Sequence, residues 1–187
     1  MRLIHLTLVL VALTAAGCGV TAPAPTVAVP AGLPAHVALD SRLLDDGRGV
    51  PQVGEVAPDF SFTTQDGTAQ KLSDLRGRLV LVNFWATWCA PCKEEMPDLQ
   101  RIADERGAQV VVLGVNKLEA LEAIAPFARQ MDTTFTLVPN PAGDVSDRYA
   151  AKNIPTTYFI NSDGTIGAVQ LGVMTYEQAS EQIARLR

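Results

Sequence analysis

Two cysteines separated by two residues follow shortly after the most continuous apolar run beyond the N-terminal segment. The run Leu79–Trp85 is apolar at nearly every position, as a strand buried on both faces of a sheet requires. The motif Cys89-Ala90-Pro91-Cys92 then opens a segment in which Met96, Leu99 and Ile102 recur at helical spacing. The chain must therefore fold so that a helix begins with the cysteine pair and packs back against a buried strand.

Paired strands are predicted on both sides of this strand and helix. Phe60 and Phe62 alternate with polar residues ahead of an Asp66-Gly67 turn, which indicates an antiparallel hairpin. Towards the C-terminus, a turn of Asn, Ser, Asp and Gly separates two strand-like segments at residues 156–160 and 165–171.

The remaining patterns alternate between helix and strand. They predict strands at residues 110–115 and 134–138, and helices at residues 120–131, 144–151 and 176–186. Pro97 and Pro126 lack an N–H group and are expected to bend their helices. This order predicts an α/β fold, with a central mixed β-sheet flanked by helices and an added N-terminal β-hairpin.

The first residues of the chain have the composition of a secretion signal. Arg2 is followed by an apolar run that ends near Leu13 and then by small residues before Cys18. A membrane-spanning helix needs about 20 apolar residues, so this run is too short to be a permanent anchor. Residues 13–19 resemble a bacterial lipobox, which implies a signal peptide at residues 1–17 and Cys18 as the lipid anchor. The alternative is ordinary cleavage nearby, with Cys18 removed or left as a free thiol.

A proline-punctuated segment separates this N-terminus from the predicted sheet. Residues 18–49 begin with a stretch rich in Ala, Thr, Val and Pro, which favours extended and solvated backbone. We expect this segment to be a spacer in which residues 35–46 form a short amphipathic helix. The folded domain is predicted at residues 50–187, and a chain of 187 residues is too short for two domains of ordinary size.

Charge and cysteine content exclude some classes of protein. The formal net charge is -5 and no cluster of basic residues is present, so we expect no binding of nucleic acid. The chain has three cysteines, and with Cys18 assigned to the anchor only Cys89 and Cys92 remain in the domain. An exported domain with one such pair has no disulfide framework, so its stability must come from its core.

The position of the cysteine pair at a helix start favours redox chemistry. Unpaired N–H groups and the helix dipole stabilise negative charge there, so Cys89 is predicted to form the attacking thiolate. Cys92, one helical turn further on, is predicted to resolve the mixed disulfide that Cys89 forms with a substrate. Pro91 suits the first helical turn because its missing N–H would have no partner there.

Two other interpretations of the pair are weaker. A structural zinc site needs four ligands, yet the only histidines are His5 and His36, both outside the predicted domain. A purely structural disulfide between Cys89 and Cys92 would close a very short loop and so constrain little of the unfolded chain.

The segment from Phe84 to Pro97, with the sequence FWATWCAPCKEEMP, resembles the active-site segment of the TlpA/ResA-like thioredoxins. The similarity extends from VGEVAPDF at residues 53–60 to NIPTTYFI at residues 153–160, and covers about residues 52–187. Members of that family are exported or membrane-tethered disulfide reductases. The resemblance implies a thioredoxin-like fold with an added N-terminal hairpin.

The resemblance also implies roles for residues distant from the cysteines in the sequence. Pro155 corresponds to a cis-proline that packs beside the two sulfur atoms. Glu119 follows Val115 at the spacing of a buried family acid, which could exchange a proton with Cys92 during resolution. Alternatively, Glu119 only occupies the first turn of a helix, as acidic residues often do. Glu122 is a second candidate for the acid.

The residues around the sulfurs are predicted to form a docking surface for substrates. Trp85 ends the buried strand and is assigned to the core, whereas Trp88 adjoins the first cysteine and is assigned to the surface. The predicted docking residues are Trp88, Ala90, Pro91, Ile154 and Thr156.

We therefore predict a monomeric protein-disulfide reductase that needs no cofactor or metal. In family terms it would reduce disulfides of exported proteins, such as apocytochrome c, and be re-reduced by a membrane electron donor. One alternative is a peroxiredoxin-like peroxidase, although Ala86 stands where those enzymes need Thr or Ser. Another is a Cu(I) metallochaperone, because soft thiolates bind Cu(I).

Overall fold

Strand β4 (Leu79–Trp85) lies at the centre of a five-stranded sheet in the computed structural model, which describes Val29 and residues 31–187. The strand order is β6-β5-β4-β7-β8. β4 is parallel to β5 and antiparallel to β7, β6 is parallel to β5, and β8 is antiparallel to β7. The other four strands are β5 (Val110–Asn116), β6 (Thr136–Val138), β7 (Thr156–Ile160) and β8 (Ile166–Leu171).

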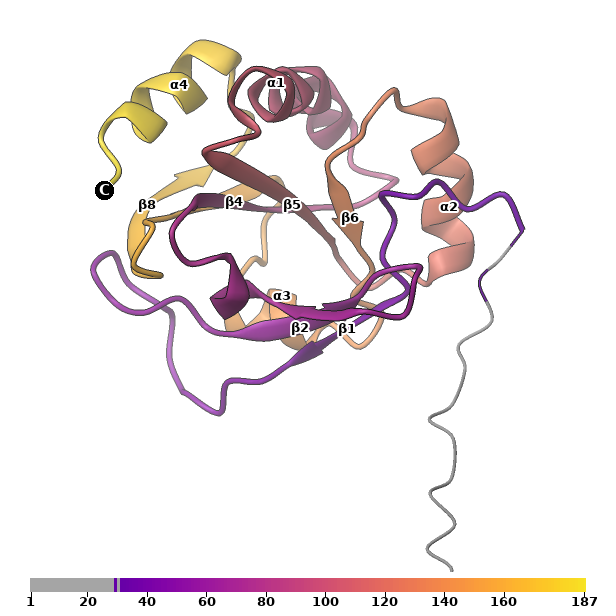
Figure 1. The fold of residues 1–187 in the computed structure, drawn as a ribbon, viewed down its shortest axis with the longest axis horizontal. Coiled ribbons are helices and arrows are strands. Elements are labelled where there is room, and N and C mark those ends of the chain that lie inside the picture. Colours follow the sequence, from indigo (N-terminus) through magenta and orange to yellow (C-terminus); the bar gives the residue numbers. More distant parts are fainter. Residues whose placement is uncertain (1–28, 30) are drawn as a thin grey trace, which may run out of the picture.

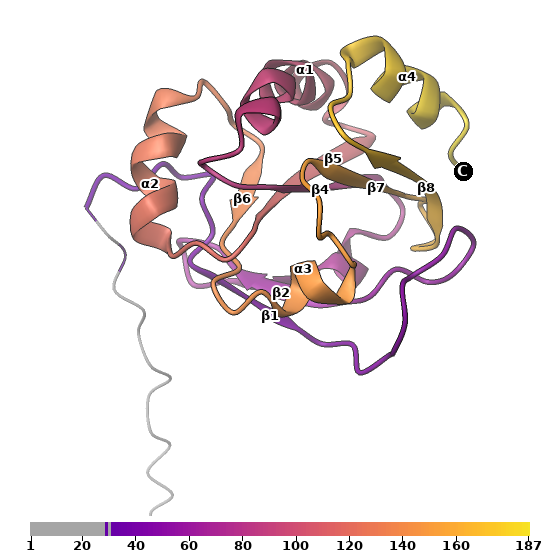
Figure 2. The same cartoon turned by 180° about the vertical axis from the view of Figure 1, so that it is seen from behind.

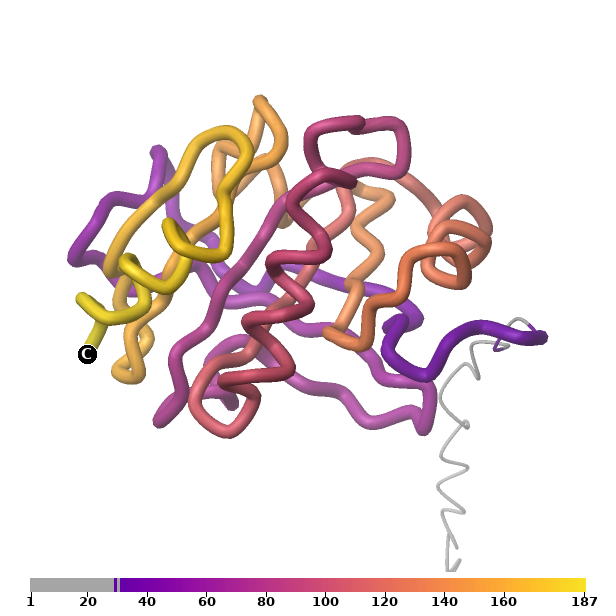
Figure 3. The backbone as a smooth tube through the Cα atoms, turned by 90° about the horizontal axis from the view of Figure 1, so that it is seen from above, coloured from indigo at the N-terminus to yellow at the C-terminus, as the bar shows by residue number. Residues whose placement is uncertain are grey.

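Helices and a smaller sheet cover the two faces of the central sheet (Figures 1 and 2). One face carries α1 (Ala90–Arg106), α2 (Leu121–Gln130) and α4 (Tyr176–Ala184). Seen from above, α1 crosses the sheet between α4 and α2 (Figure 3). The other face carries α3 (Asp144–Arg148) and an antiparallel sheet of β1 (Asp40–Leu43), β2 (Phe60–Thr63) and β3 (Ala69–Lys71), followed by the 3-10 helix η1 (Leu72–Leu75).

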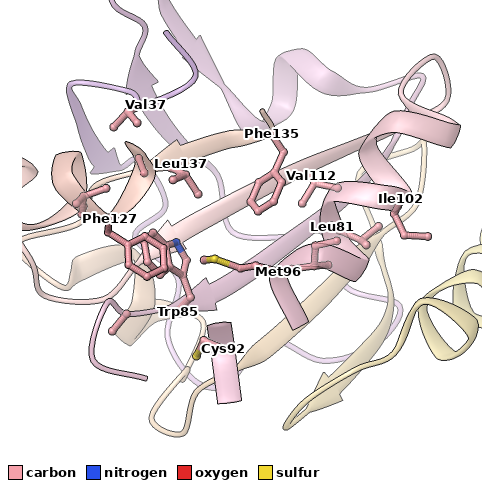
Figure 4. Close-up of a cluster of buried hydrophobic side chains, with 14 of the residues drawn as sticks. Val37, Leu81, Trp85, Cys92, Met96, Ile102, Val112, Phe127, Phe135 and Leu137 are labelled. Atoms are coloured by element: carbon pink, nitrogen blue, oxygen red, sulfur yellow. The ribbon is translucent and has the colours of Figure 1, made fainter. Parts of the chain in front are cut away.

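Alternation along β4 builds a separate core on each face. Leu81 and Trp85 belong to the cluster beneath α1 and α2, whereas Phe84 belongs to the cluster beneath α3. The indole ring of Trp85 packs on Phe127 with ring centroids 4.8 Å apart. Cys92 lies at the edge of the same cluster (Figure 4). The cysteine-bearing helix is therefore anchored by apolar packing directly behind its second sulfur.

The predicted fold class is confirmed. The central sheet is mixed, helices cover its faces, and β2 and β3 form the expected antiparallel hairpin. Both proline-containing helices continue beyond Pro97 and Pro126. Pro97 is exposed, so water can hydrate the carbonyl group that has lost its helical donor.

The prediction of a helix at residues 35–46 is wrong. Asp40–Leu43 is strand β1, which pairs with β2, and Val37 forms a parallel bridge with Leu137 of β6. Val37 and Leu39 are buried, although they were placed in the spacer. Their spacing of two residues fits a strand, and the backbone partners that select it lie about 20 and 100 residues away. The folded unit therefore begins well before residue 50.

The predictions for the extreme N-terminus concern residues outside the described part of the chain. These are the signal peptide at residues 1–17 and the anchor at Cys18. Within Val29 and residues 31–187, no helix combines the length and the apolar character needed to cross a membrane.

Candidate redox site

The two cysteines lie where β4 passes into α1, at the C-terminal end of the central strand. Cys89 is the N-cap residue of the helix, and its Sγ accepts a hydrogen bond from the backbone N–H of Cys92 at 3.2 Å. The two side chains form a disulfide, and their Cα atoms are 5.3 Å apart. The relative exposure is 4% for Cys89 and 0% for Cys92. Both residues are therefore buried, and only Cys89 keeps any exposed surface.

The loop before β7 lies against the first sulfur. The Ile154–Pro155 peptide bond is cis, as the resemblance implies, and Pro155 is buried. The carbonyl oxygen of Ile154 lies 3.8 Å from Cys89 Sγ. Antiparallel pairing of β7 with β4 brings this loop to the cysteines, because Thr156 stands opposite Phe84.

Glu119 lies in the loop between β5 and α2, and its carboxylate holds the loop that leads from β4 to Cys89. It accepts hydrogen bonds from the backbone N–H of Thr87 at 2.8 Å and from the Thr87 hydroxyl at 2.5 Å. A third donor, Asn116 Nδ2, is 2.8 Å away. Glu119 is half-buried, whereas the alternative candidate Glu122 is exposed.

The same loop also holds the segment that leads to the cis-proline. Lys117 Nζ donates hydrogen bonds to the carbonyl oxygens of Ala151 and Lys152, at 2.8 and 2.9 Å. One short loop is thus bonded to both halves of the candidate site.

The buried carboxyl group of this region belongs to Glu95, which the sequence analysis did not select. Glu95 lies on α1 three residues after Cys92, and its relative exposure is 1%. Its carboxylate accepts hydrogen bonds from Asn83 Nδ2 at 2.7 Å and from the backbone N–H of Met174 at 3.0 Å. Desolvation outweighs these bonds and raises the pKa of Glu95 to about 7.

Glu95 could have been recognised from helical spacing. Cys92, Met96 and Leu99 form the apolar face of α1, and position 95 lies on that face because it is three residues from the cysteine. An acidic residue inside an apolar stripe is a polar group that must be buried, which is uncommon without a partner or a function.

The predicted docking residues differ in exposure. Trp88 is 67% exposed beside the first cysteine, and Ala90 and Pro91 are exposed in the first turn of α1. Ile154 is half-buried, whereas Thr156 is buried and donates its hydroxyl hydrogen to the carbonyl oxygen of Asn153. The assignment of Trp85 to the core is confirmed, since its exposure is 0%.

Comparisons with known proteins agree with this geometry. Residues 53–169 match the model of the AhpC/TSA family. The thiol-disulfide oxidoreductase ResA of Oceanobacillus iheyensis is 36% identical over 148 residues, which are 75% of this chain and 76% of the relative.

Two solved structures extend the similarity to the fold. One, described as the thiol:disulfide interchange protein DsbE of Chlorobium tepidum, has a TM-score of 0.67 and 29% identity, covering 73% of this chain and 99% of that one. The exposed lipoprotein thioredoxin Etrx1 of Streptococcus pneumoniae has a TM-score of 0.62 and 28% identity, covering 68% of this chain and 99% of that one.

Three findings together assign the family of this chain. They are the cysteine pair at a helix N-terminus, the cis-proline loop against the first sulfur, and the relatives that match over most of their length. The chain is a thiol-disulfide oxidoreductase of the AhpC/TSA family, and it belongs to the TlpA/ResA-like group of the thioredoxin superfamily.

Proposed function

We propose that this protein is an extracytoplasmic reductase of protein disulfides, in which Cys89 is the attacking thiol and Cys92 the resolving thiol. The observation that carries the proposal is the capping geometry at the start of α1. Cys89 Sγ accepts the N–H of Cys92 at the positive end of a 17-residue helix, where a thiolate is stabilised.

The reaction then proceeds in two exchanges. The Cys89 thiolate attacks one sulfur of the substrate disulfide, forms a mixed disulfide and releases the first substrate thiolate. The Cys92 thiolate next attacks Cys89 Sγ, which closes the Cys89–Cys92 disulfide and releases the second substrate thiolate. Two electrons pass to the substrate, and the substrate thiolates take up two protons.

Resolution requires that Cys92 lose its proton inside the protein. Cys92 is fully buried, and Glu95 stands one helical turn further along the same helix with a pKa of about 7. A carboxyl group with that pKa can accept and return a proton near neutral pH. The proton-handling role that the sequence suggested for Glu119 therefore fits Glu95 better. We propose that Glu119 instead positions the loop before Cys89 through Thr87.

The remaining predicted residues form the approach to Cys89. The Ile154 carbonyl oxygen lies against the first sulfur, cis-Pro155 follows it in the chain, and the exposed Trp88 directly precedes Cys89. We propose that substrates dock across Trp88, Ala90, Pro91 and Ile154, while Thr156 shapes the loop from its buried position.

We further propose that the domain is tethered outside the cytoplasm by a lipid on Cys18, after removal of residues 1–17. The composition of the N-terminus supports this, as does similarity to a protein described as an exposed lipoprotein thioredoxin. Exported proteins such as apocytochrome c are then the substrates, and a membrane protein supplies the electrons.

The proposal can be tested by catalysed reduction of insulin with dithiothreitol as the electron source. We expect the wild-type protein to accelerate the reaction and Cys89→Ser to abolish the acceleration. Cys92→Ser should instead accumulate a mixed disulfide, because the resolving thiol is missing. Equal rates for wild type and Cys89→Ser would contradict the proposal.

The direction of electron flow has its own measurement. Thioredoxin-fold dithiols span potentials from about -270 mV to about -120 mV, and a reductase should lie towards the negative end. Equilibration of the Cys89–Cys92 pair with defined thiol buffers gives the value. A midpoint near -120 mV would make the protein an oxidant rather than a reductase.

A further inference from the structure

A groove of about 510 Å³ lies between strands β7 and β8 and residues 50–53, which precede β2 in the chain. Its lining includes Val50 and Val53 of that segment and Val169 and Leu171 of β8. These four side chains are 55%, 60%, 36% and 72% exposed. They are four of the ten large hydrophobic side chains exposed in the described part of the chain, so apolar exposure is concentrated here.

The strand beside the groove has an unprotected edge. β8 is the outermost strand of the central sheet, and its sequence from Ile166 to Leu171 contains no charged residue and no proline. Among the described residues, another segment is hydrogen-bonded to its outer edge only at Ile166, through Gly54 and Glu55, and the side chain of Gln170 donates to the carbonyl oxygen of Leu171 at 3.2 Å. Natural sheets usually protect such edges with charges, prolines or covering segments, so an edge left open is suited to pairing with another chain.

The groove continues directly from the redox site. Leu171 stands opposite Thr156, the residue after the cis-proline, and Thr156 itself lines the groove. The backbone N–H of Gly172 donates to the carbonyl oxygen of Pro155 at 2.9 Å, which fixes the end of β8 to the cis-proline loop. The cis-proline loop therefore borders both the first sulfur, through Ile154, and the groove, through Thr156.

We propose that the groove binds an extended apolar segment of the substrate polypeptide next to its reactive cysteine. This inference rests on the proposed reductase function. In an extended segment alternate side chains point the same way, so every second residue can enter the groove while the backbone follows β8. Lys152 is the only charged side chain that lines the groove, so basic residues in the segment should weaken binding.

A second copy of this chain is the less suitable occupant. A stable dimer through β8 would rest against the strand end that is bonded to the cis-proline loop, and would obstruct substrates at Cys89. An extended substrate segment uses the same edge without that conflict, because it arrives together with the disulfide that reacts.

The test uses two fluorogenic peptides with the same disulfide and the same net charge. One carries alternating Val and Leu beside a cysteine, and the other carries Thr and Ser at those positions. The reduced full chain is mixed with each peptide, and each rate is divided by that enzyme's own rate with oxidised glutathione. We expect the wild type to reduce the apolar peptide about fivefold faster or more, because apolar surface is buried on binding.

Substitutions locate the preference within the molecule. Val53→Thr and Leu171→Thr should each lower the preference for the apolar peptide at least about threefold, because each removes apolar contact area. Val56→Thr is the matched control, since Val56 is 62% exposed but lies outside the groove. It should keep the wild-type preference.

The possible failures are distinguishable. If the wild type reduces neither oxidised glutathione nor either peptide, the proposed reductase function fails. If the wild type reduces oxidised glutathione but reduces the two peptides at equal rates, the groove does not bind substrate. The same conclusion follows if Val56→Thr lowers the preference as much as Val53→Thr does. If light scattering shows a dimer that Leu171→Thr converts to a monomer, the edge is an interface between copies and the substrate role is overturned.

Discussion

Glu95 has the most perturbed acidic group near the two sulfurs. Burial raises its pKa from 4.5 to about 7, although two hydrogen-bond donors favour the ionised form. An acid whose pKa is raised in the folded state binds its proton more tightly there than in the unfolded chain. Folding is therefore favoured at low pH, and this contribution is lost as the pH rises from 4.5 to 7.

This linkage predicts a change in stability that depends on pH. Between pH 4.5 and 7, Glu95 loses its proton in the unfolded chain but largely keeps it in the folded protein. This difference should lower the free energy of unfolding of the oxidised protein by about 3 kcal/mol over that range. Glu95→Gln should lack that contribution, so its free energy of unfolding should rise relative to wild type over this range. Urea unfolding at several pH values measures the difference. The exposed neighbour Glu94, changed to Gln, should follow the wild type, and parallel curves for Glu95→Gln would contradict the assignment.

Glu119 allows a second test at this scale, because positioning and proton transfer predict different results. Glu119→Ala removes the acceptor for both donors of Thr87 and should lower the rate of disulfide reduction on the order of tenfold. Glu119→Gln keeps an oxygen for the Thr87 N–H and should restore most of that rate without moving the pH profile. If the Gln variant is as slow as the Ala variant, Glu119 acts through its ionisable group instead.

At the scale of elements, the segment before residue 50 is part of the folded unit. Its backbone joins β2 through β1 and joins β6 through Val37, so it covers edges of both sheets. Gln65 Nε2 also donates to the carbonyl oxygen of Val37 at 3.1 Å. The segment is therefore attached to the domain through specific contacts.

These contacts predict that Val37 contributes to stability. Val37→Ala removes two buried methyl groups and should lower the free energy of unfolding by about 2 kcal/mol. Denaturant unfolding provides the measurement. Val56→Ala, at an exposed position, should change the value by less than about 0.5 kcal/mol. Equal stabilities of Val37→Ala and wild type would mean that the segment is a spacer after all.

At the scale of the whole molecule, the redox site is assembled from four parts of the chain. Cys89 meets Ile154 across 65 residues of sequence, Thr87 meets Glu119 across 32, and Glu95 meets Met174 across 79. These parts meet at the end of the central sheet where β4 and β5 end and β7 begins. The groove beside β8 includes Thr156 at this same end of the sheet. The redox site and the proposed site of substrate recognition are therefore adjacent.

The sequence by itself determined the order of strands and α-helices from Phe60 onwards, the buried character of β4 and the placement of Cys89 and Cys92 at a helix start. Each of these depends on residues close together in the chain, where apolar periodicity and turn residues act directly. The cis bond at Pro155 was reached only through family resemblance, because an isolated Ile-Pro sequence favours trans.

Tertiary structure alone decided the rest. The helix predicted near residue 40 is a strand, because β2 and β6 supply backbone partners that come from distant parts of the chain. The sequence pointed to Glu119 for proton handling, whereas we propose Glu95, whose carboxylate meets Asn83 of β4 and the Met174 backbone after β8. Helical spacing places Glu95 on the buried face of α1, but the packed molecule decides how far its carboxyl group is removed from water and which donors meet it.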